Sequence, residues 1–193
     1  MPFYIIFKKP IRQSDSKLLS SKNFVKLHKG LWVSQTFNYN IHVRSKVNWN
    51  STIILKTSRK LQKVLVNPVK NVYDLGSLIL IAYDFPLNPR VRKAVSRLIR
   101  RSPCFKLASS IYLYPQCNYR KYEGTLLISP NILIKSVIVL GGRVICASRL
   151  QLLSPMIAEM LIEEFKDRLK KRLNLIFQCC LKIKMKNGIK IGL

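Results

Sequence analysis

The sequence predicts an α+β fold, and three observations lead to this prediction. Short apolar runs rich in β-branched and aromatic residues alternate with segments whose apolar residues recur at helical spacing. Apolar residues make up 48% of the 193 residues, which is enough for a buried core. The strand and helix pattern of the first part of the chain also recurs in the second. We therefore expect a first half over residues 1–70, a second half over 71–153, and a C-terminal amphipathic helix with a basic tail over 154–193.

The first half is expected to open with a buried strand at residues 3–7, FYIIF. A polar segment with weak helical periodicity follows at 11–24. Residues 25–37 are rich in β-formers and alternate in part, and 39–49 could be their hairpin partner. Residues 52–66 fit helical and strand spacing alike, so their structure stays open.

The second half is expected to follow a linker at 67–71, NPVKN. A continuous apolar strand is predicted at 77–85 and another strand at 104–114. The helix after Pro89 would carry four apolar residues on one face, at i, i+4, i+7 and i+8: Val91, Val95, Leu98 and Ile99.

A further helix and strand complete the second half. Residues 129–142 begin with Ser129 as N-cap and Pro130 at the first helical position, and Gly141 is a stop signal. Residues 143–153 are expected to form a strand.

Ser154-Pro155 predicts the start of a long helix that ends near Phe177. Its apolar residues recur every four positions: Ile157, Leu161, Phe165, Leu169 and Leu173. The helix over 155–177 could pack across the sheet, or it could bind a protein partner or a second copy of the chain. The tail from residue 181 alternates apolar and basic residues, which fits an edge strand or a flexible basic tail.

The charge is the dominant feature of the composition. The chain has 35 Lys and Arg against 8 Asp and Glu, a net charge of +27. This excess excludes internal neutralisation, so most cations must face solvent or a polyanion. Nucleic acid is the first candidate partner and an anionic membrane surface the second. Residues 1–122 contain three acids, so the contact is expected mainly there: Asp15, Asp74 and Asp84.

The cysteines and histidines do not form a metal-binding pattern. The five cysteines include no CxxC, and the chain has two histidines, so no metal or other cofactor is expected. We interpret the cysteines as reduced, mostly buried thiols of a cytoplasmic protein. Neither a signal peptide nor an uncharged apolar run of about 20 residues is predicted.

The two halves resemble each other at two places. FYIIFKKP matches LILIAYDFP, and VKLHKGLWVSQ matches FKLASSIYLYPQ. Lys26-Leu27 falls on Lys106-Leu107, and Leu31-Trp32-Val33 falls on Ile111-Tyr112-Leu113. Two short apolar matches also arise by chance, so a duplication and a coincidence both stay open.

Residues 78–116 contain a strand ending in Tyr-Asp-Phe-Pro, a basic helix, and Phe-x-Leu-x-x-Ser-φ-aromatic-φ, where φ is apolar. This combination resembles the ferredoxin-like domain of the Cas-two proteins of CRISPR spacer acquisition. It is still closer to the Cas-two-like domain at the C-terminus of phenylacetate-type repressors. The resemblance implies a β-α-β-β-α-β unit. Two units in tandem would mimic the usual dimer of such domains.

Asp84 is the weak catalytic candidate. The resemblance implies that this aspartate ends the first strand and that two copies face each other as a metal site. Here the matching residue of the first half is Lys8, which would repel a divalent cation. We therefore interpret Asp84 as part of the strand-to-helix turn or as an arginine partner. Mg²⁺ is expected only if the chain is a nuclease.

Basic residues without neighbouring acids are the candidate phosphate contacts. The helix after Pro89 supplies six of them: Arg90, Arg92, Lys93, Arg97, Arg100 and Arg101. A second run lies in the first half: Lys56, Arg59, Lys60 and Lys63. Arg120 and Lys121 stand between tyrosines in a predicted loop.

Three aromatic residues on predicted strands have two interpretations. Exposed rings of Trp32, Tyr112 and Tyr114 could stack on unpaired bases, or the rings could belong to the core. Alternation places the two tyrosines on one face and Ile111 and Leu113 on the other, so at least one of these faces could meet solvent or a partner.

The sequence therefore favours a non-catalytic nucleic-acid-binding protein, with RNA preferred slightly over DNA, as a subunit of a ribonucleoprotein. The alternatives are a metal-dependent nuclease that uses Asp84 and a repressor-like DNA-binding protein. No helix-turn-helix, Gly-rich phosphate loop or Ser/His/Asp grouping is evident.

Overall fold

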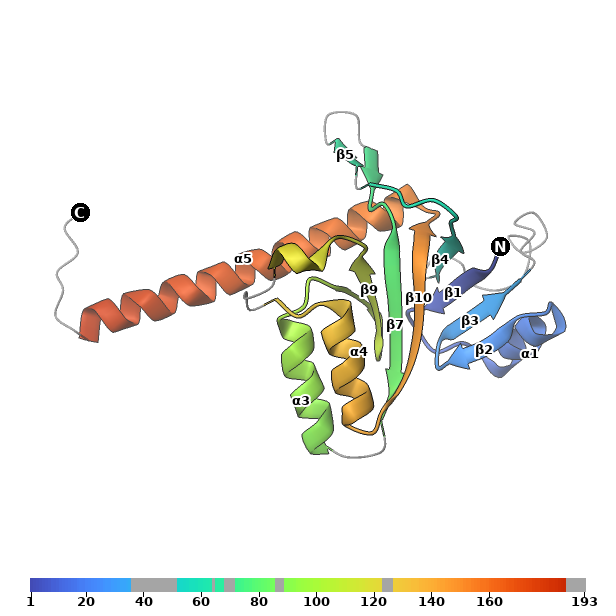
Figure 1. The fold of residues 1–193 in the computed structure, drawn as a ribbon, viewed down its shortest axis with the longest axis horizontal. Coiled ribbons are helices and arrows are strands. Elements are labelled where there is room, and N and C mark those ends of the chain that lie inside the picture. The colour runs from blue at the N-terminus through green and yellow to red at the C-terminus, as the bar shows by residue number, and fades with distance from the viewer. Residues whose placement is uncertain (36–51, 64, 68–71, 86–88, 123–126, 187–193) are drawn as a thin grey trace.

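The computed structural model describes residues 1–35, 52–63, 65–67, 72–85, 89–122 and 127–186, and its main feature is an antiparallel sheet of eight strands (Figure 1). The α+β class is confirmed. The first half supplies β1 (Phe3–Phe7), β2 (Val25–His28), β3 (Leu31–Ser34) and β4 (Thr52–Thr57). The second half supplies β7 (Leu78–Asp84), β8 (Phe105–Ala108), β9 (Ile111–Pro115) and β10 (Arg143–Leu152).

The strand order is the same in both halves. The sheet reads β2-β3-β1-β4-β10-β7-β9-β8. If the four sheet strands of each half are numbered one to four along the chain, their order in the sheet is two, three, one, four in both halves. β4 and β10 join the halves, with Leu150 opposite Thr57 and Leu152 opposite Leu55. Residues 3–7 and 78–84 are thus interior strands of one continuous sheet, whereas the two tandem units expected from the sequence would each form a sheet of their own.

The pairing register also repeats. In β1, Ile5 lies opposite Trp32, and in β7, Ile81 lies opposite Tyr112. The two hairpins have an irregularity at the same place, directly after Lys26 opposite Trp32 and after Lys106 opposite Tyr112. The sequence match of Lys26 with Lys106 and of Trp32 with Tyr112 therefore corresponds to equivalent positions in the structure.

The hairpin turns match as well. Gly30 has a φ of 83° and Ser110 a φ of 59°, both in the left-handed region. The Phe7 N–H donates to the Gly30 carbonyl at 2.9 Å, and the Tyr83 N–H donates to the Ser110 carbonyl at 3.0 Å. Each turn is therefore tied to the end of the central strand of its own half.

Helices cover one face of each half (Figure 1). α1 (Gln13–Ser21) packs Leu19 against the first half, and α3 (Pro89–Arg100) and α4 (Pro130–Val139) cover the second. Val95 is buried, as the helical spacing predicted. Ser129 caps α4 by accepting from the Ile132 N–H at 3.4 Å, which confirms the predicted start of this helix.

The opposite faces of the two halves share one core. Ile6 and Leu31 of the first half lie in the same buried cluster as Leu80 and Ile111 of the second. α5 (Pro155–Lys186) adds Ala158 and Leu161 to this cluster and then runs past the sheet and away from it (Figure 1).

The predicted apolar stripe of α5 packs only in its first part. Leu161 is fully buried and Phe165 packs against the core, but Leu169 is 43% exposed and Leu173 is 64% exposed. α5 also continues beyond the predicted end near Phe177 to Lys186. Residues 181–186 are therefore helical, and neither the predicted edge strand nor the predicted flexible tail forms there. Residues 187–193 lie outside the described residues.

Three other predictions concern the first half. The hairpin forms within residues 25–34, between β2 and β3, whereas the predicted partner at 39–49 lies outside the described residues. The ambiguous segment 52–66 contains the strand β4. The predicted linker contributes its first residue to β5 (Leu65–Asn67), which pairs with β6 (Val72–Asp74) as a separate hairpin.

The described cysteines are less buried than predicted, because Cys104 is buried while Cys117 and Cys146 are exposed. All three are free thiols. Among the helices in the described part of the chain, none has the length and apolar character needed to cross a bilayer.

Candidate functional site

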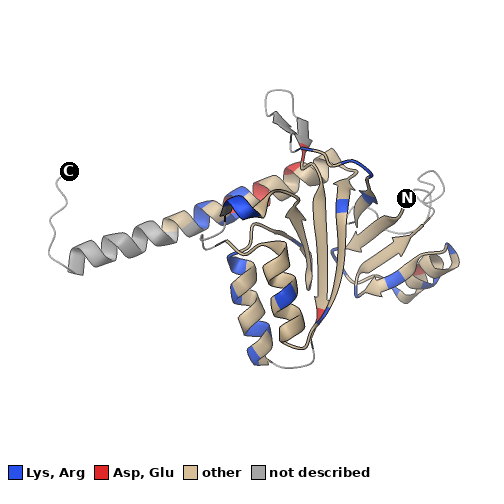
Figure 2. Cartoon of the chain, viewed as in Figure 1, with Lys and Arg blue, Asp and Glu red and all other residues tan. Residues whose placement is uncertain are grey.

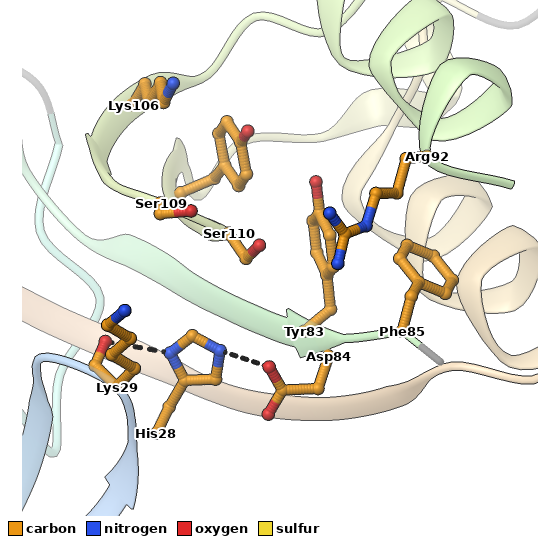
Figure 3. A pocket seen from close by; sticks show the side chains of 10 residues that line it. His28, Lys29, Tyr83, Asp84, Phe85, Arg92, Lys106, Ser109 and Ser110 are labelled. Carbon is orange, nitrogen blue, oxygen red and sulfur yellow. Dashed lines mark hydrogen bonds and ion pairs between the residues drawn. The ribbon is translucent and has the colours of Figure 1, made fainter. Parts of the chain in front are cut away.

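A histidine and an aspartate meet where the halves come together. His28 ends β2 and Asp84 ends β7, and His28 Nε2 lies 2.8 Å from Asp84 Oδ1 (Figure 3). The histidine side chain is 4% exposed and the aspartate side chain 70%. The sequence favoured an arginine partner or a turn for Asp84 and showed no neighbouring histidine. The partner found is His28 and not an arginine, and the first half supplies it. Residues 86–88 of the turn itself lie outside the described residues, so the turn role of Asp84 stays a prediction.

The imidazole of His28 makes a polar contact through each ring nitrogen. Its Nε2 contacts Asp84 at the end of β7, and its Nδ1 lies 3.1 Å from the carbonyl oxygen of Lys29. The ring is therefore held between the β2–β3 turn and the end of β7.

The pair forms one side of a pocket of about 340 Å³, which we call the His28 pocket. Three cations line it from three different elements: Lys29 from the β2–β3 turn, Arg92 from α3 and Lys106 from β8 (Figure 3). The remaining lining residues are aromatic or hydroxylic: Tyr83, Phe85, Ser109, Ser110 and Tyr112. This lining is chemically complementary to an anion with a flat or apolar part.

The two tyrosines of the pocket are neutral. The rings of Tyr83 and Tyr112 stack with centroids 5.8 Å apart and planes 6° apart. Burial is the main cause that raises the pKa of both phenols, and the neighbouring Tyr112 raises that of Tyr83 further. Both hydroxyls therefore keep their protons at neutral pH and do not add negative charge to the site.

A second pocket of about 300 Å³ lies beside the first, and we call it the Trp32 pocket. Lys29 and Ser109 line both pockets. The Trp32 pocket also contains Lys26, which the repeat places where Lys106 stands in the His28 pocket. We use the name seam for the two adjoining pockets together.

The two pockets differ at their strand ends. Lys8 follows β1 where Asp84 ends β7, which agrees with the match made from the sequence. Lys8 Nζ lies 3.7 Å from a carboxylate oxygen of Glu164 on α5. Ala108 takes the place that His28 has in the first half, so the counterpart of the His28–Asp84 contact does not form.

The basic residues predicted on the helix after Pro89 lie on α3 and directly after it. All are exposed, and Figure 2 shows basic residues along α3 without an acidic one: Arg90, Arg92, Lys93, Arg97, Arg100 and Arg101. In the described part of the chain, Arg92, Lys93, Arg97 and Arg100 form no ion pair. Arg92 joins this surface to the His28 pocket.

The other predicted contacts do not form a second basic helix. Lys56 is half-buried on β4, with its Nζ 5.8 Å from the centroid of the Phe3 ring. Three more are exposed after β4: Arg59, Lys60 and Lys63. Arg120 and Lys121 are exposed on a short 3-10 helix, Tyr119–Tyr122, instead of the predicted loop.

Of the two interpretations of the aromatic residues, the structure bears out the core. Trp32 is 2% exposed, Tyr112 6% and Tyr114 0%, so these rings belong to the core. The prediction that one face of β9 meets solvent fails. α3 and α4 cover the two tyrosines, while the first half and α5 cover Ile111 and Leu113.

Sequence reasoning missed His28, Lys26, Lys29 and the second-half lysine Lys106. The match of Lys26 with Lys106 was visible in the sequence, but nothing in it places the two hairpin turns side by side.

In the described ranges, no three His, Cys, Asp or Glu residues gather as potential metal ligands. Comparison with family models, curated proteins and solved structures finds no match to this chain.

Proposed function

We propose that this chain binds the phosphate backbone of nucleic acid, with RNA preferred over DNA. One observation carries the proposal: the exposed basic face of α3 continues through Arg92 into a pocket that holds two further cations, Lys29 and Lys106. Placing cations from both halves around one site is electrostatically favourable only if a bound anion compensates their mutual repulsion.

The composition supports the same conclusion. With 35 Lys and Arg and 8 Asp and Glu, one-to-one pairing leaves 35 − 8 = 27 cations without a carboxylate. Such an excess in a chain with a substantial core is typical of ribonucleoprotein subunits, and this is the basis of the preference for RNA.

The fold supports a more specific assignment. We propose that each half is a ferredoxin-like unit, because the second, third, first and fourth strands are neighbours in both halves. The Cas-two-like resemblance of residues 78–116 belongs to this proposal, since β7, α3, β8 and β9 lie in that range. In the first half, most of the segment between β3 and β4 lies outside the described residues.

Reversal of charge on α3 tests the proposed function. Wild-type binding to a structured RNA should weaken steeply between about 50 and 200 mM salt. Arg92→Glu, Arg97→Glu and Arg100→Glu together should nearly abolish binding. The control is Lys17→Glu, Lys22→Glu and Lys170→Glu, which changes the net charge by the same amount on α1, directly after α1 and on α5. Salt-independent binding, or equal loss in both variants, would contradict the proposal.

A metal-dependent nuclease is the second candidate, and the observation in its favour is the 70% exposed carboxylate of Asp84 at the edge of a pocket. The cations Lys29, Arg92 and Lys106 line the same pocket and would repel a divalent metal ion. We therefore give this candidate second place.

The exposed part of α5 is a proposed contact for a protein partner or a second copy of the chain. Its support is the exposure of Leu169 and Leu173, which continue the apolar stripe beyond the core.

A further inference from the structure

The two pockets of the seam form one continuous cationic surface between the halves. Lys29 lies in both pockets, with Lys26 in the Trp32 pocket and Lys106 in the His28 pocket. The internal repeat relates the outer two lysines, since each lies opposite the aromatic residue of its own hairpin. Three lysines from two hairpins therefore follow one another across the junction.

The charge along the seam is almost entirely positive. Asp84 is the acid among the residues that line the two pockets, and one of its carboxylate oxygens contacts His28 Nε2. Lys8 is paired with Glu164. Lys9, Lys26, Lys29, Lys106 and Arg92 line the seam and form no ion pair in the described part of the chain.

The dimensions of the pockets favour an unpaired strand over a duplex as the ligand. Volumes of about 340 and 300 Å³ are at the lower end of the range for small-molecule sites, which suits one nucleotide unit each. A duplex is too wide to enter such a pocket, whereas an unpaired strand presents its phosphates and bases singly.

The neutral lining fits the same ligand. Ser109 and Ser110 supply hydroxyl donors, and Phe85 is a half-buried aromatic side chain in the His28 pocket. Tyr83 and Tyr112 add neutral, largely buried rings to the wall of this pocket.

We propose that a single-stranded segment of nucleic acid lies across the seam, with one phosphate at Lys29 and its neighbours at Lys26 and Lys106. This inference rests on the proposed function and adds that the nucleic acid bound in the seam is single-stranded. Arg92 stands at the border between the seam and α3, so a paired region on α3 continues into an unpaired strand in the seam.

The test compares two ligands and two sets of variants. The ligands are an unstructured oligouridylate of about ten nucleotides and an RNA duplex without overhangs. The seam variant is Lys29→Glu with Lys106→Glu, which leaves the Lys8–Glu164 ion pair and the Lys26–Trp32 contact intact. The charge-matched control is Lys17→Glu with Lys22→Glu, and the helix variant is Arg97→Glu with Arg100→Glu.

The seam variant should lose single-strand affinity by about tenfold relative to the control, and the salt slope should fall by about 0.7 for each lost contact. Its duplex affinity should equal that of the control, while the helix variant should lose duplex affinity. Single-strand binding by the seam variant at the control level would overturn the inference. If the wild type binds neither ligand, the proposed function itself fails.

Photocrosslinking of the wild type gives a readout that does not depend on variant folding. An oligouridylate containing 4-thiouridine should crosslink to peptides around residues 26–32 and 106–112. Crosslinks confined to α3 or α5 would contradict the inference. Displacement of the oligonucleotide by polyglutamate of equal length and charge would identify an acidic protein segment as the ligand and would also overturn it.

Discussion

His28 and Asp84 are 56 residues apart in the sequence, and their side chains meet 2.8 Å apart at the junction of the two halves. One partner is buried and the other largely exposed. The contact closes one side of a cationic pocket, and it gives Asp84 a partner that the sequence did not indicate.

A double-mutant cycle should show that the two residues are coupled. Asp84→Ala should lower the free energy of unfolding by about 1 kcal/mol, because the bond is charge-assisted but half of the pair is exposed to solvent. In a His28→Asn background the same change should cost much less. Urea unfolding of the four proteins gives the coupling. Asp167→Ala on α5 is the control, and additive effects of the two changes would show that the contact contributes nothing.

Asp84 should not support nucleic-acid cleavage. The histidine holds one carboxylate oxygen, and the surrounding lysines and arginine oppose metal binding. Wild type and Asp84→Asn should both leave single- and double-stranded RNA and DNA intact in the presence of Mg²⁺ or Mn²⁺. Cleavage by the wild type that disappears in Asp84→Asn, with folding and binding retained, would make the nuclease the better assignment.

A side chain at Gly30 in the β2–β3 turn should lower stability. Its φ is 83°, and a Cβ there would lie 3.1 Å from the Phe7 carbonyl oxygen. Gly30→Ala should lower the free energy of unfolding by about 1–2 kcal/mol. Gly141→Ala is the matched control, because it has a φ of 78° and no atom within 4 Å of the added Cβ. Thermal or urea unfolding should rank Gly30→Ala as the more costly change, and the reverse order would count against the turn geometry.

Stability should fall at alkaline pH because of the buried tyrosines. Burial raises the pKa of Tyr83, Tyr112 and Tyr114 above that of the unfolded chain, which is about 10. Their contribution to stability is therefore complete below pH of about 10 and is lost as the pH rises further.

Tyr114→Phe removes one of these ionising groups and keeps the packed ring. Above the unfolded pKa, its free energy of unfolding should fall less steeply with pH than that of the wild type, by about 1.4 kcal/mol per pH unit. Deprotonation of lysines affects both proteins equally. Circular dichroism melts across this pH range measure the difference, and identical curves would show that Tyr114 ionises as easily in the folded chain as in the unfolded one.

The sequence by itself determined the local elements. Helical spacing placed Val95 inside and the basic residues of α3 outside, Ser129 and Pro130 marked the start of α4, and continuous apolar residues defined β7. These features depend on residues within a few positions of one another, so local propensity, capping and periodicity are sufficient to predict them.

The repeat was visible in the sequence as Lys26 matched to Lys106, but its meaning required the pairing register. The register shows that both lysines precede the same irregularity and lie opposite the same aromatic position. Amino-acid type alone does not distinguish this equivalence from a chance match.

Only the tertiary structure decided which surfaces are covered. Alternation along β9 separates Tyr112 from Leu113, but it cannot tell that α3 and α4 cover one face while the first half and α5 cover the other. The aromatic rings are therefore buried, and the His28–Asp84 side of the pocket arises from two strand ends that the fold brings together. A contact over 56 residues follows from how the halves pack, because neither segment carries a local signal for the other.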